Sequence, residues 1–149
     1  MTATDPGVDT ILAEVTDRLR QRGGRASAGL RPVLEALVAA DGHRSAEELA
    51  GDVHTRHPEI HESTVYRNLD RFEQLGVAYH THLGHGPALW HLTASIHQHL
   101  TCEACGAVVA VDPAVFTALA ATLQREAGFV ADFRHFAISG RCAACHTEP

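Results

Sequence analysis

Two Cys-x-x-Cys knuckles place the strongest constraint on how this chain folds. Cys102 and Cys105 form the first knuckle, Cys142 and Cys145 form the second, and the chain has no other cysteine. Two thiolates three positions apart can hold one metal ion from a tight turn, and two such turns complete the tetrahedral sulfur shell that Zn²⁺ prefers. The spacing therefore predicts a structural zinc site with no open position for catalysis. Free or redox-active thiols are the alternative.

The composition is that of a folded chain without a membrane segment. Hydrophobic residues make up 45% of the 149 residues, which is ordinary for a globular protein. No apolar run approaches the ~20 residues of a membrane span, and the first residues lack the basic and apolar regions of a signal peptide. We therefore expect a cytoplasmic protein with no membrane partner. In that compartment cysteines bind metal more often than they form disulfides.

The basic residues are unevenly distributed. The formal net charge is −6, yet all twelve basic residues are arginines, and the stretch 18–31 contains no acidic residue. This stretch predicts a patch that faces DNA phosphates on an otherwise acidic body. The arginines expected to contact the DNA backbone are Arg18, Arg20, Arg22 and Arg25. A solvated helix face is the alternative.

The first half of the chain has the apolar spacing of short helices. Ser45 and Glu48 form a capping box at the start of the third helix, and Gly76 ends the fourth. The expected helices cover residues 8–22, 30–41, 45–56 and 63–75.

Beyond Gly76 the pattern becomes strand-like, and 77–82 and 88–92 flank a glycine-rich turn. This predicts a β-hairpin. Short helices followed by a hairpin are the plan of a winged helix, whose last helix enters the major groove while the hairpin contacts the DNA backbone.

The second half is a smaller α/β segment. Strand-like stretches lie near 99–101 and 107–111, Asp112 and Pro113 start a helix that Gly128 ends, and 129–139 reads as a strand that leads to the second knuckle. We therefore predict an α+β fold. A winged-helix DNA-binding domain would cover residues 1–93, and a small α/β domain with the four-cysteine zinc site would cover 94–149.

Two segments carry a family resemblance. STVYRNL at 63–69 is similar to the recognition helix, and HQHLTCEACG at 97–106 to the first knuckle, of the ferric uptake regulator (Fur) family. The likeness covers about residues 15–146. It implies a metal-responsive transcriptional repressor whose second domain forms a homodimer and which binds a palindromic operator in double-stranded DNA. Segments 79–86 and 135–142 are most similar to the nickel-uptake-regulator branch, which implies control of metal uptake and homeostasis genes.

The resemblance implies a first regulatory metal site at the junction of the two domains. Its ligands would be His43, His91, His97 and His99. A metal ion that bridges both domains fixes their relative angle, and with it the spacing of the two recognition helices in a dimer. It can do so only through its higher affinity for that arrangement.

The nickel branch implies a second regulatory site made by His80, His82 and His135. His80 and His82 are two positions apart on an expected strand, so both rings face the same side. For any single histidine, a solvated imidazole is the alternative.

Both expected sites are rich in imidazole and poor in carboxylates. Such ligands suit Ni²⁺, Zn²⁺, Co²⁺ or Cu²⁺ better than Mn²⁺ or Fe²⁺. Ala110 stands where many members of the family carry a carboxylate, which points the same way. We expect Ni²⁺ as the regulatory metal, with Zn²⁺ or Fe²⁺ as alternatives.

For DNA, the fourth helix offers the best contacts. Arg67 can bind a guanine edge or a phosphate, and the ring of Tyr66 can pack on a thymine methyl group. Ser63 and Thr64 lie near the helix start. Packing against the wing is the alternative for Tyr66.

Two other functions remain open. In a peroxide sensor of the same fold, peroxide would oxidise a histidine that binds Fe²⁺, but the carboxylate-poor site disfavours it. In a hydrolytic zinc enzyme, three histidines would hold Zn²⁺ and a water molecule. No acidic residue has a general-base spacing such as His-Glu-x-x-His. We therefore expect neither an enzyme nor a small organic substrate.

Overall fold

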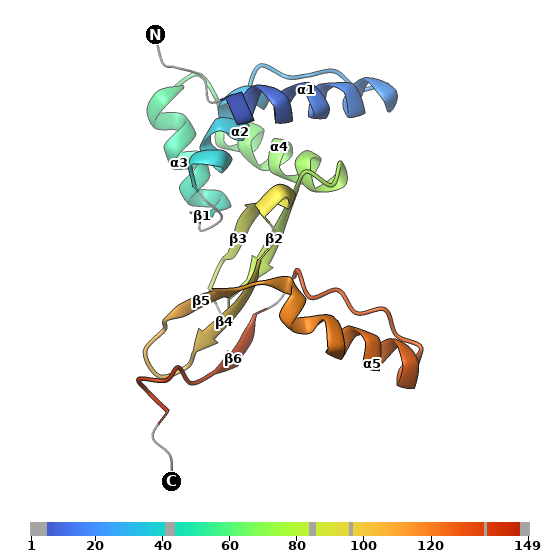
Figure 1. Cartoon of the computed structure of the whole chain (residues 1–149). Coiled ribbons are helices and arrows are strands. Elements are labelled where there is room, and N and C mark those ends of the chain that lie inside the picture. Colours follow the sequence, from blue (N-terminus) through green and yellow to red (C-terminus); the bar gives the residue numbers. More distant parts are fainter. Residues whose placement is uncertain (1–5, 41–43, 84–85, 96, 136, 147–149) are drawn as a thin grey trace. The chain divides into compact units, whose positions relative to one another are not determined.

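The computed structural model describes residues 6–40, 44–83, 86–95, 97–135 and 137–146. It divides into two compact units (Figure 1). The first contains the chain up to His80 together with Leu89–Ser95. The second contains Thr81–Ala88 and the chain from residue 96 onward. The domain boundary predicted between residues 93 and 94 remains a prediction.

Four helices build the first unit, in the order expected. They are α1 (Pro6–Gln21), α2 (Leu30–Ala39), α3 (Ala46–Arg56) and α4 (Glu62–Gln74). The capping box at the start of α3 is confirmed: the Ser45 hydroxyl accepts from the backbone N–H of Glu48 at 3.2 Å, and the Glu48 carboxylate accepts from the backbone N–H of Ser45 at 2.8 Å. Two orphan donors at the helix end are thereby satisfied.

One hydrophobic core holds these helices together. Its residues include Val15, Leu34, Leu49, Val65 and Phe72, all fully buried. α2 packs against α1, α3 and α4, because its apolar residues recur at helical spacing and cover most of its circumference. The helix expected to bind DNA, α4, therefore also contributes its buried face to this core.

The expected hairpin follows α4. β2 (Ala78–His82) and β3 (Ala88–Leu92) pair, and the short β1 (Arg44–Ser45) adds to β3 in an antiparallel arrangement with Arg44 opposite Trp90. A short 3₁₀ turn, η1 (Thr93–Ser95), ends this part of the chain. Helices plus a three-stranded antiparallel sheet make this unit a winged helix.

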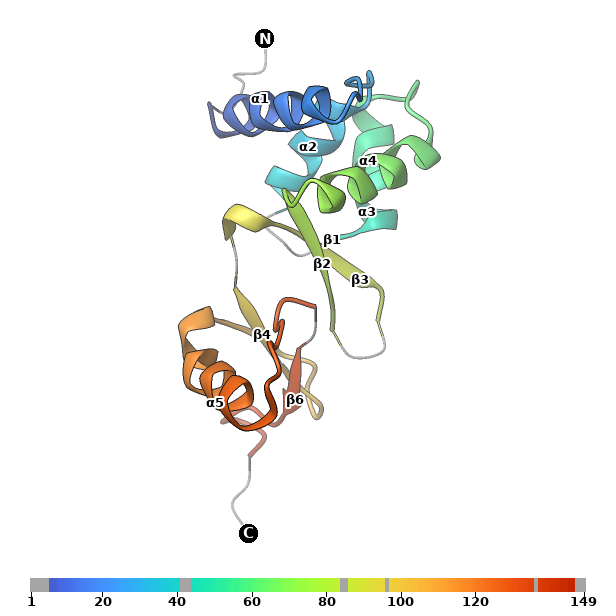
Figure 2. The same ribbon diagram turned by 90° about the vertical axis from the view of Figure 1, so that its right-hand side faces the viewer.

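The second unit is a three-stranded sheet with one helix. β4 (Gln98–Cys102) is central, with β5 (Val108–Val111) antiparallel on one side and β6 (Ile138–Gly140) parallel on the other. A 3₁₀ turn, η2 (Pro113–Phe116), leads into α5 (Thr117–Ala127), which lies beside the sheet (Figures 1 and 2). The predicted cap is confirmed, since the Asp112 carboxylate accepts from the backbone N–H of Ala114 at 2.8 Å. The α+β fold class is therefore confirmed.

The strand expected over 129–139 is much shorter than predicted. Among the described residues of this segment, the strand is limited to Ile138–Gly140. The carboxylate of Asp132 accepts from the backbone N–H of Arg134 at 2.9 Å and pairs with the Arg134 guanidinium at 2.7 Å. A carboxylate that bonds the backbone two residues on makes a turn, which competes with strand pairing.

None of the helices in the described part of the chain is long and apolar enough to cross a membrane.

A close approach at Gly29 fixes α2 against α4. A Cβ atom at Gly29 would lie 2.7 Å from the Thr64 side-chain methyl and 3.3 Å from the Asn68 amide nitrogen. Asn68 is buried, accepts from the Ser27 hydroxyl at 3.2 Å and donates to the Thr64 carbonyl at 2.8 Å, so it has little room to move.

We predict that Gly29→Ala lowers the free energy of unfolding by about 1–3 kcal/mol, because the added methyl group overpacks this contact. The matched control is Gly51→Ala in α3, where a Cβ atom meets nothing within 4 Å. It should raise stability by about 0.5–1 kcal/mol, since alanine favours a helix. Urea unfolding followed by circular dichroism measures both. Equal stability of the two variants would contradict the close packing of α2 on α4.

Candidate metal centre and DNA-binding surface

The four cysteines converge in the second unit. Cys102 ends β4 and Cys105 follows in a tight turn that Gly106 leaves with φ of 73°. The second knuckle follows β6, and the backbone N–H of Cys145 donates to the Cys142 carbonyl at 2.9 Å. Because β6 pairs with β4 in parallel, the two knuckles leave the sheet at the same end.

The sulfur spacing fits one metal ion. The four Sγ atoms all lie within 4.8 Å of one another, and those of Cys105 and Cys142 are 3.8 Å apart. Zn–S bonds of about 2.3 Å at tetrahedral angles place sulfurs ~3.8 Å apart. A disulfide would need about 2.05 Å, and all four thiols are free. The donor set therefore matches a tetrahedral zinc ion.

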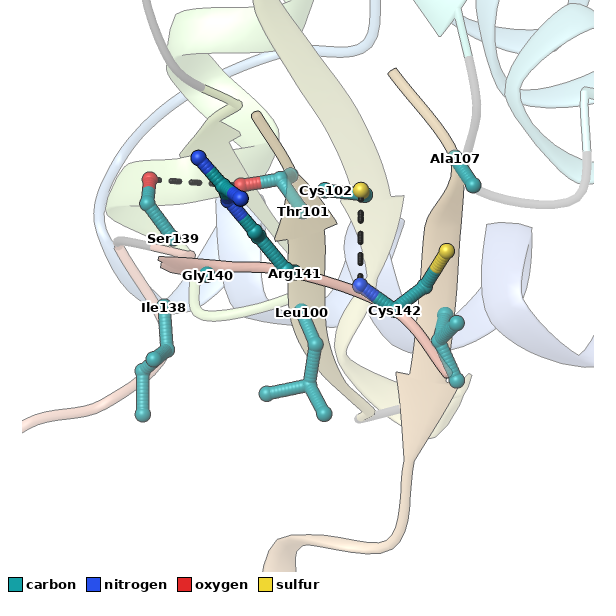
Figure 3. Close-up of a pocket in the computed structure, with 10 residues that line it drawn as sticks. Leu100, Thr101, Cys102, Ala107, Ile138, Ser139, Gly140, Arg141 and Cys142 are labelled. Atoms are coloured by element: carbon teal, nitrogen blue, oxygen red, sulfur yellow. Dashed lines mark hydrogen bonds between the residues drawn. The ribbon is translucent and has the colours of Figure 1, made fainter. Parts of the chain in front are cut away.

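Backbone N–H donors favour the thiolate form of one of these cysteines, which is the form that binds a metal ion. The backbone N–H of Cys142 lies 3.4 Å from the Cys102 sulfur (Figure 3). Hydrogen bonds from the backbone of Cys142, then of Cys105, lower the pKa of Cys102 to about 6. The surrounding thiols, Cys105 first, raise the pKa of Cys145 to about 12. A bound cation would replace the proton that Cys145 otherwise keeps near neutral pH.

An apolar hollow lies beside the knuckles. Figure 3 shows Leu100, Ile138 and Cys142 among the side chains that line it, and its volume is about 160 Å³. Ile138 and the neighbouring Val108 and Val109 on β5 are exposed. This end of the sheet thus presents apolar surface next to the sulfur cluster.

Within the second unit, two of the histidines predicted for the first regulatory site lie together. His97 immediately precedes β4 and His99 is the second residue of β4, and their ring centroids are 4.6 Å apart in an edge-to-face arrangement. His91 belongs to the first unit, on β3, where its ring stacks on Tyr79 at 5.1 Å. His43 lies outside the described residues. The joint site of these four histidines remains a prediction.

The residues predicted for the second regulatory site are distributed over both units. His80 lies in the first unit on β2. His82 and His135 lie in the second unit, where the backbone N–H of His82 donates to the His135 carbonyl at 3.4 Å. The nearby Thr81 hydroxyl donates to the Arg134 carbonyl at 2.6 Å. These bonds hold the segment of His82 to that of His135; the three-histidine site itself remains a prediction.

Sequence reasoning missed an acidic neighbour of His80. The Nδ1 atom of His80 lies 2.7 Å from the Glu73 Oε1 atom. Glu73 is in the last turn of α4, and the chain reverses at Gly76, whose φ is 69°. The glycine stop was visible in the sequence, but which helix residue it would bring against β2 was not.

The predicted DNA-contact residues occupy the exposed start of α4. Ser63, Tyr66 and Arg67 are exposed, whereas Thr64 is half-buried against Gly29. The guanidinium of Arg67 donates to the Ser63 carbonyl at 3.1 Å and to the Ser63 hydroxyl at 3.2 Å. Tyr66 and Arg67 therefore lie on an open helix face.

Two of the four arginines predicted to contact the DNA backbone bind carbonyl groups of the protein itself. Arg18 donates to the Leu75 carbonyl and Arg22 donates to the Gln74 carbonyl at 3.0 Å, at the C-terminal end of α4. Cations there satisfy free carbonyls and oppose the negative end of the helix dipole. Arg20 pairs with Asp17 at 3.4 Å, and the side chain of Arg25 is exposed.

Comparison with known proteins identifies a family and several similar structures. The model of the ferric uptake regulator family matches residues 21–136. The peroxide-responsive repressor PerR of Staphylococcus epidermidis is 24% identical over 148 residues, which is 99% of each chain. The structure of Helicobacter pylori Fur matches with a TM-score of 0.73 and 18% identity over the whole of both chains. That of Vibrio cholerae Fur matches with a TM-score of 0.63 and 28% identity, over 85% of this chain and 98% of the other.

The winged helix, the four-cysteine cluster and a family match over most of the chain agree, and the chain belongs to the ferric uptake regulator family of metal-responsive regulators.

Proposed function

We propose that this protein is a transcriptional repressor which binds a palindromic operator as a metal-loaded homodimer and controls metal uptake and homeostasis genes. The observation that carries the proposal is the exposed face of α4, where Tyr66 and Arg67 stand clear of the core in a chain of this family. A two-fold dimer that presents two such helices matches a palindrome. The cell compartment in which it would act is the cytoplasm.

The surface of the second unit supports the homodimer. Val108 and Val109 of β5 and Leu119 of α5 are exposed, Val130 is 82% exposed, and α5 has no buried residue. Exposed apolar surface of this kind marks an interaction site. A second copy of this unit would cover it.

A structural zinc ion in the four-cysteine cluster is the second element of the proposal. The 3.8 Å sulfur separation supports it. The ion would link the end of β4 to the segment after β6, in which none of the described residues 141–146 is buried. Its part is to stabilise the second unit and through it the dimer.

Nickel is the proposed regulatory metal, held by the histidines predicted for the two regulatory sites. The pairing of His97 with His99 at the start of β4 supports an imidazole-rich shell. Imidazole donors bind Ni²⁺ and Zn²⁺ more tightly than Mn²⁺ or Fe²⁺. Zn²⁺ and Fe²⁺ remain the alternative regulatory metals.

A peroxide sensor is the second candidate, because the curated relatives include PerR of Staphylococcus epidermidis and of Staphylococcus aureus, which are named peroxide-responsive repressors. In that function Fe²⁺ would bind in the regulatory site, and peroxide would add oxygen to a ligand histidine.

We predict that Cys105→Ser removes the tightly bound zinc and shifts the protein from dimer to monomer, because a three-sulfur site binds zinc more weakly. Elemental analysis after gel filtration and light scattering measure the two effects. His146→Ala is the matched control, since His146 is exposed and adjoins Cys145. A dimeric, zinc-free Cys105→Ser protein would contradict a structural role for zinc.

We predict that Ni²⁺ gives the largest gain in affinity for a palindromic DNA enriched from a random pool by the nickel-loaded protein. Fluorescence anisotropy with Ni²⁺, Zn²⁺, Fe²⁺ and Mn²⁺ measures it. Arg67→Ala should weaken binding by about 1–3 kcal/mol through loss of a base-edge or phosphate contact, whereas Arg125→Ala on α5 should not. A response led by Zn²⁺ or Fe²⁺ would overturn nickel, and an unaffected Arg67→Ala protein would overturn the role of α4.

We predict that hydrogen peroxide leaves the Fe²⁺-loaded protein without added oxygen on the peptides that contain His91, His97 and His99. Peptide mass spectrometry, with an anaerobic sample as the control, measures it. One added oxygen on a histidine, together with loss of DNA binding, would establish the peroxide sensor instead.

A further inference from the structure

We propose that Ser63 is a positioning residue of the DNA-binding face: it holds the guanidinium of Arg67 at the start of α4, in the pose that a bidentate contact with a guanine requires. This inference rests on the proposed function, in which α4 binds an operator. It gives Ser63 a role other than the direct DNA contact expected from the sequence, and it names the base that Arg67 would bind.

The contact brings the charge of Arg67 to the N-terminal end of the helix. Ser63 lies in the first turn of α4 and Arg67 in the second. Long side chains of a helix point back toward its N-terminus, and two hydrogen bonds fix Arg67 in that direction: its Nε atom donates to the Ser63 carbonyl at 3.1 Å, and its Nη2 atom donates to the Ser63 hydroxyl at 3.2 Å. The N-terminal residues of a recognition helix are those that contact base edges in the major groove.

The two bonds use one edge of the guanidinium and not the other. A guanidinium carries five N–H donors in a planar fork. Ser63 accepts along the edge formed by Nε and Nη2, so its bonds do not involve the edge formed by Nη1 and the second N–H of Nη2. The parallel donors of that edge match the O6 and N7 acceptors that a guanine presents in the major groove.

The expected contribution of Ser63 is small, and it lies in ordering the arginine. Both side chains are exposed, so water competes for their hydrogen bonds. An arginine that is already held in place loses less side-chain entropy when it binds DNA. The helix dipole disfavours a cation at the N-terminal end, so without the hydroxyl the guanidinium would move away from this end. Loss of the hydroxyl should therefore weaken DNA binding several-fold and not abolish it.

Fluorescence anisotropy with the Ni²⁺-loaded full chain and the enriched palindromic DNA tests the inference. Ser63→Ala should weaken binding about 3- to 10-fold, whereas Ser63→Thr, which keeps the hydroxyl, should bind like wild type. In the Arg67→Ala protein, Ser63→Ala should cause no further loss, because the hydroxyl acts through the guanidinium. Thr55→Ala is the matched control, since the exposed Thr55 of α3 donates instead to the Gly51 carbonyl at 2.8 Å; it should bind like wild type.

Two further measurements identify the base and exclude a folding effect. The analogue 7-deazaguanine, which lacks the N7 acceptor, is placed at each guanine of the palindrome in turn. At one position of each half-site it should weaken wild-type binding about fivefold or more, and it should not weaken Arg67→Ala there. Alanine favours a helix more than serine does, so urea unfolding should find Ser63→Ala at least as stable as wild type.

Four outcomes would overturn the inference, and they differ. If Ser63→Ala binds DNA like wild type while Arg67→Ala does not, α4 stands as the DNA-binding helix and the positioning role fails. If Ser63→Ala also weakens the Arg67→Ala protein, Ser63 contacts DNA directly. If 7-deazaguanine weakens wild type at no position, Arg67 binds no guanine through N7. If Arg67→Ala binds like wild type, the role of α4 in the proposed function fails together with the inference.

Discussion

The sulfur cluster is the constraint on which the second unit depends. Among the described residues of that unit, Cys102 and Phe116 are the buried hydrophobic ones, whereas the first unit has an extensive core. A unit this small buries too little apolar surface to offset the entropy of ordering its chain. A metal ion bound by the four thiolates would supply the stability that packing does not, at the end of the sheet where β4 and β6 stop.

In the first unit, the segment that precedes α2 and the end of α1 hold α4 in place and leave one face of α4 exposed. Near its start, α4 packs on Gly29 and its buried Asn68 bonds Ser27. At its other end, Arg18 and Arg22 bind its last carbonyls. The helix is thus held at both ends by the segment that precedes it, and the face with Tyr66 and Arg67 can meet a ligand without the cost of ordering the helix.

Much of this architecture follows from local sequence rules. The capping box at Ser45, the glycine stop at Gly76, the hairpin and the paired cysteines each depend on residues close in the chain, and each is confirmed. What pattern reasoning missed depends on neighbours in space. The partners of Arg18 and Arg22, and Glu73 beside His80, are set by how α4 lies against α1 and β2. The strand expected over 129–139 is shorter than predicted, because a side-chain turn at Asp132 competes with pairing.

The contact between Gly29 and Thr64 also bears on how the protein can change. Thr64 is at the start of the helix proposed to read DNA, while Gly29 lies at the start of α2 and carries no side chain that could reach a base. Because a Cβ atom at 29 would come within 2.7 Å of the Thr64 methyl, the two positions are energetically coupled. A smaller residue at 64 would admit alanine at 29, and alanine at 29 would then disfavour the return of threonine. If residue 64 changes as the operator preference changes, residue 29 is therefore expected to change with it, although Gly29 has no side chain that could contact DNA.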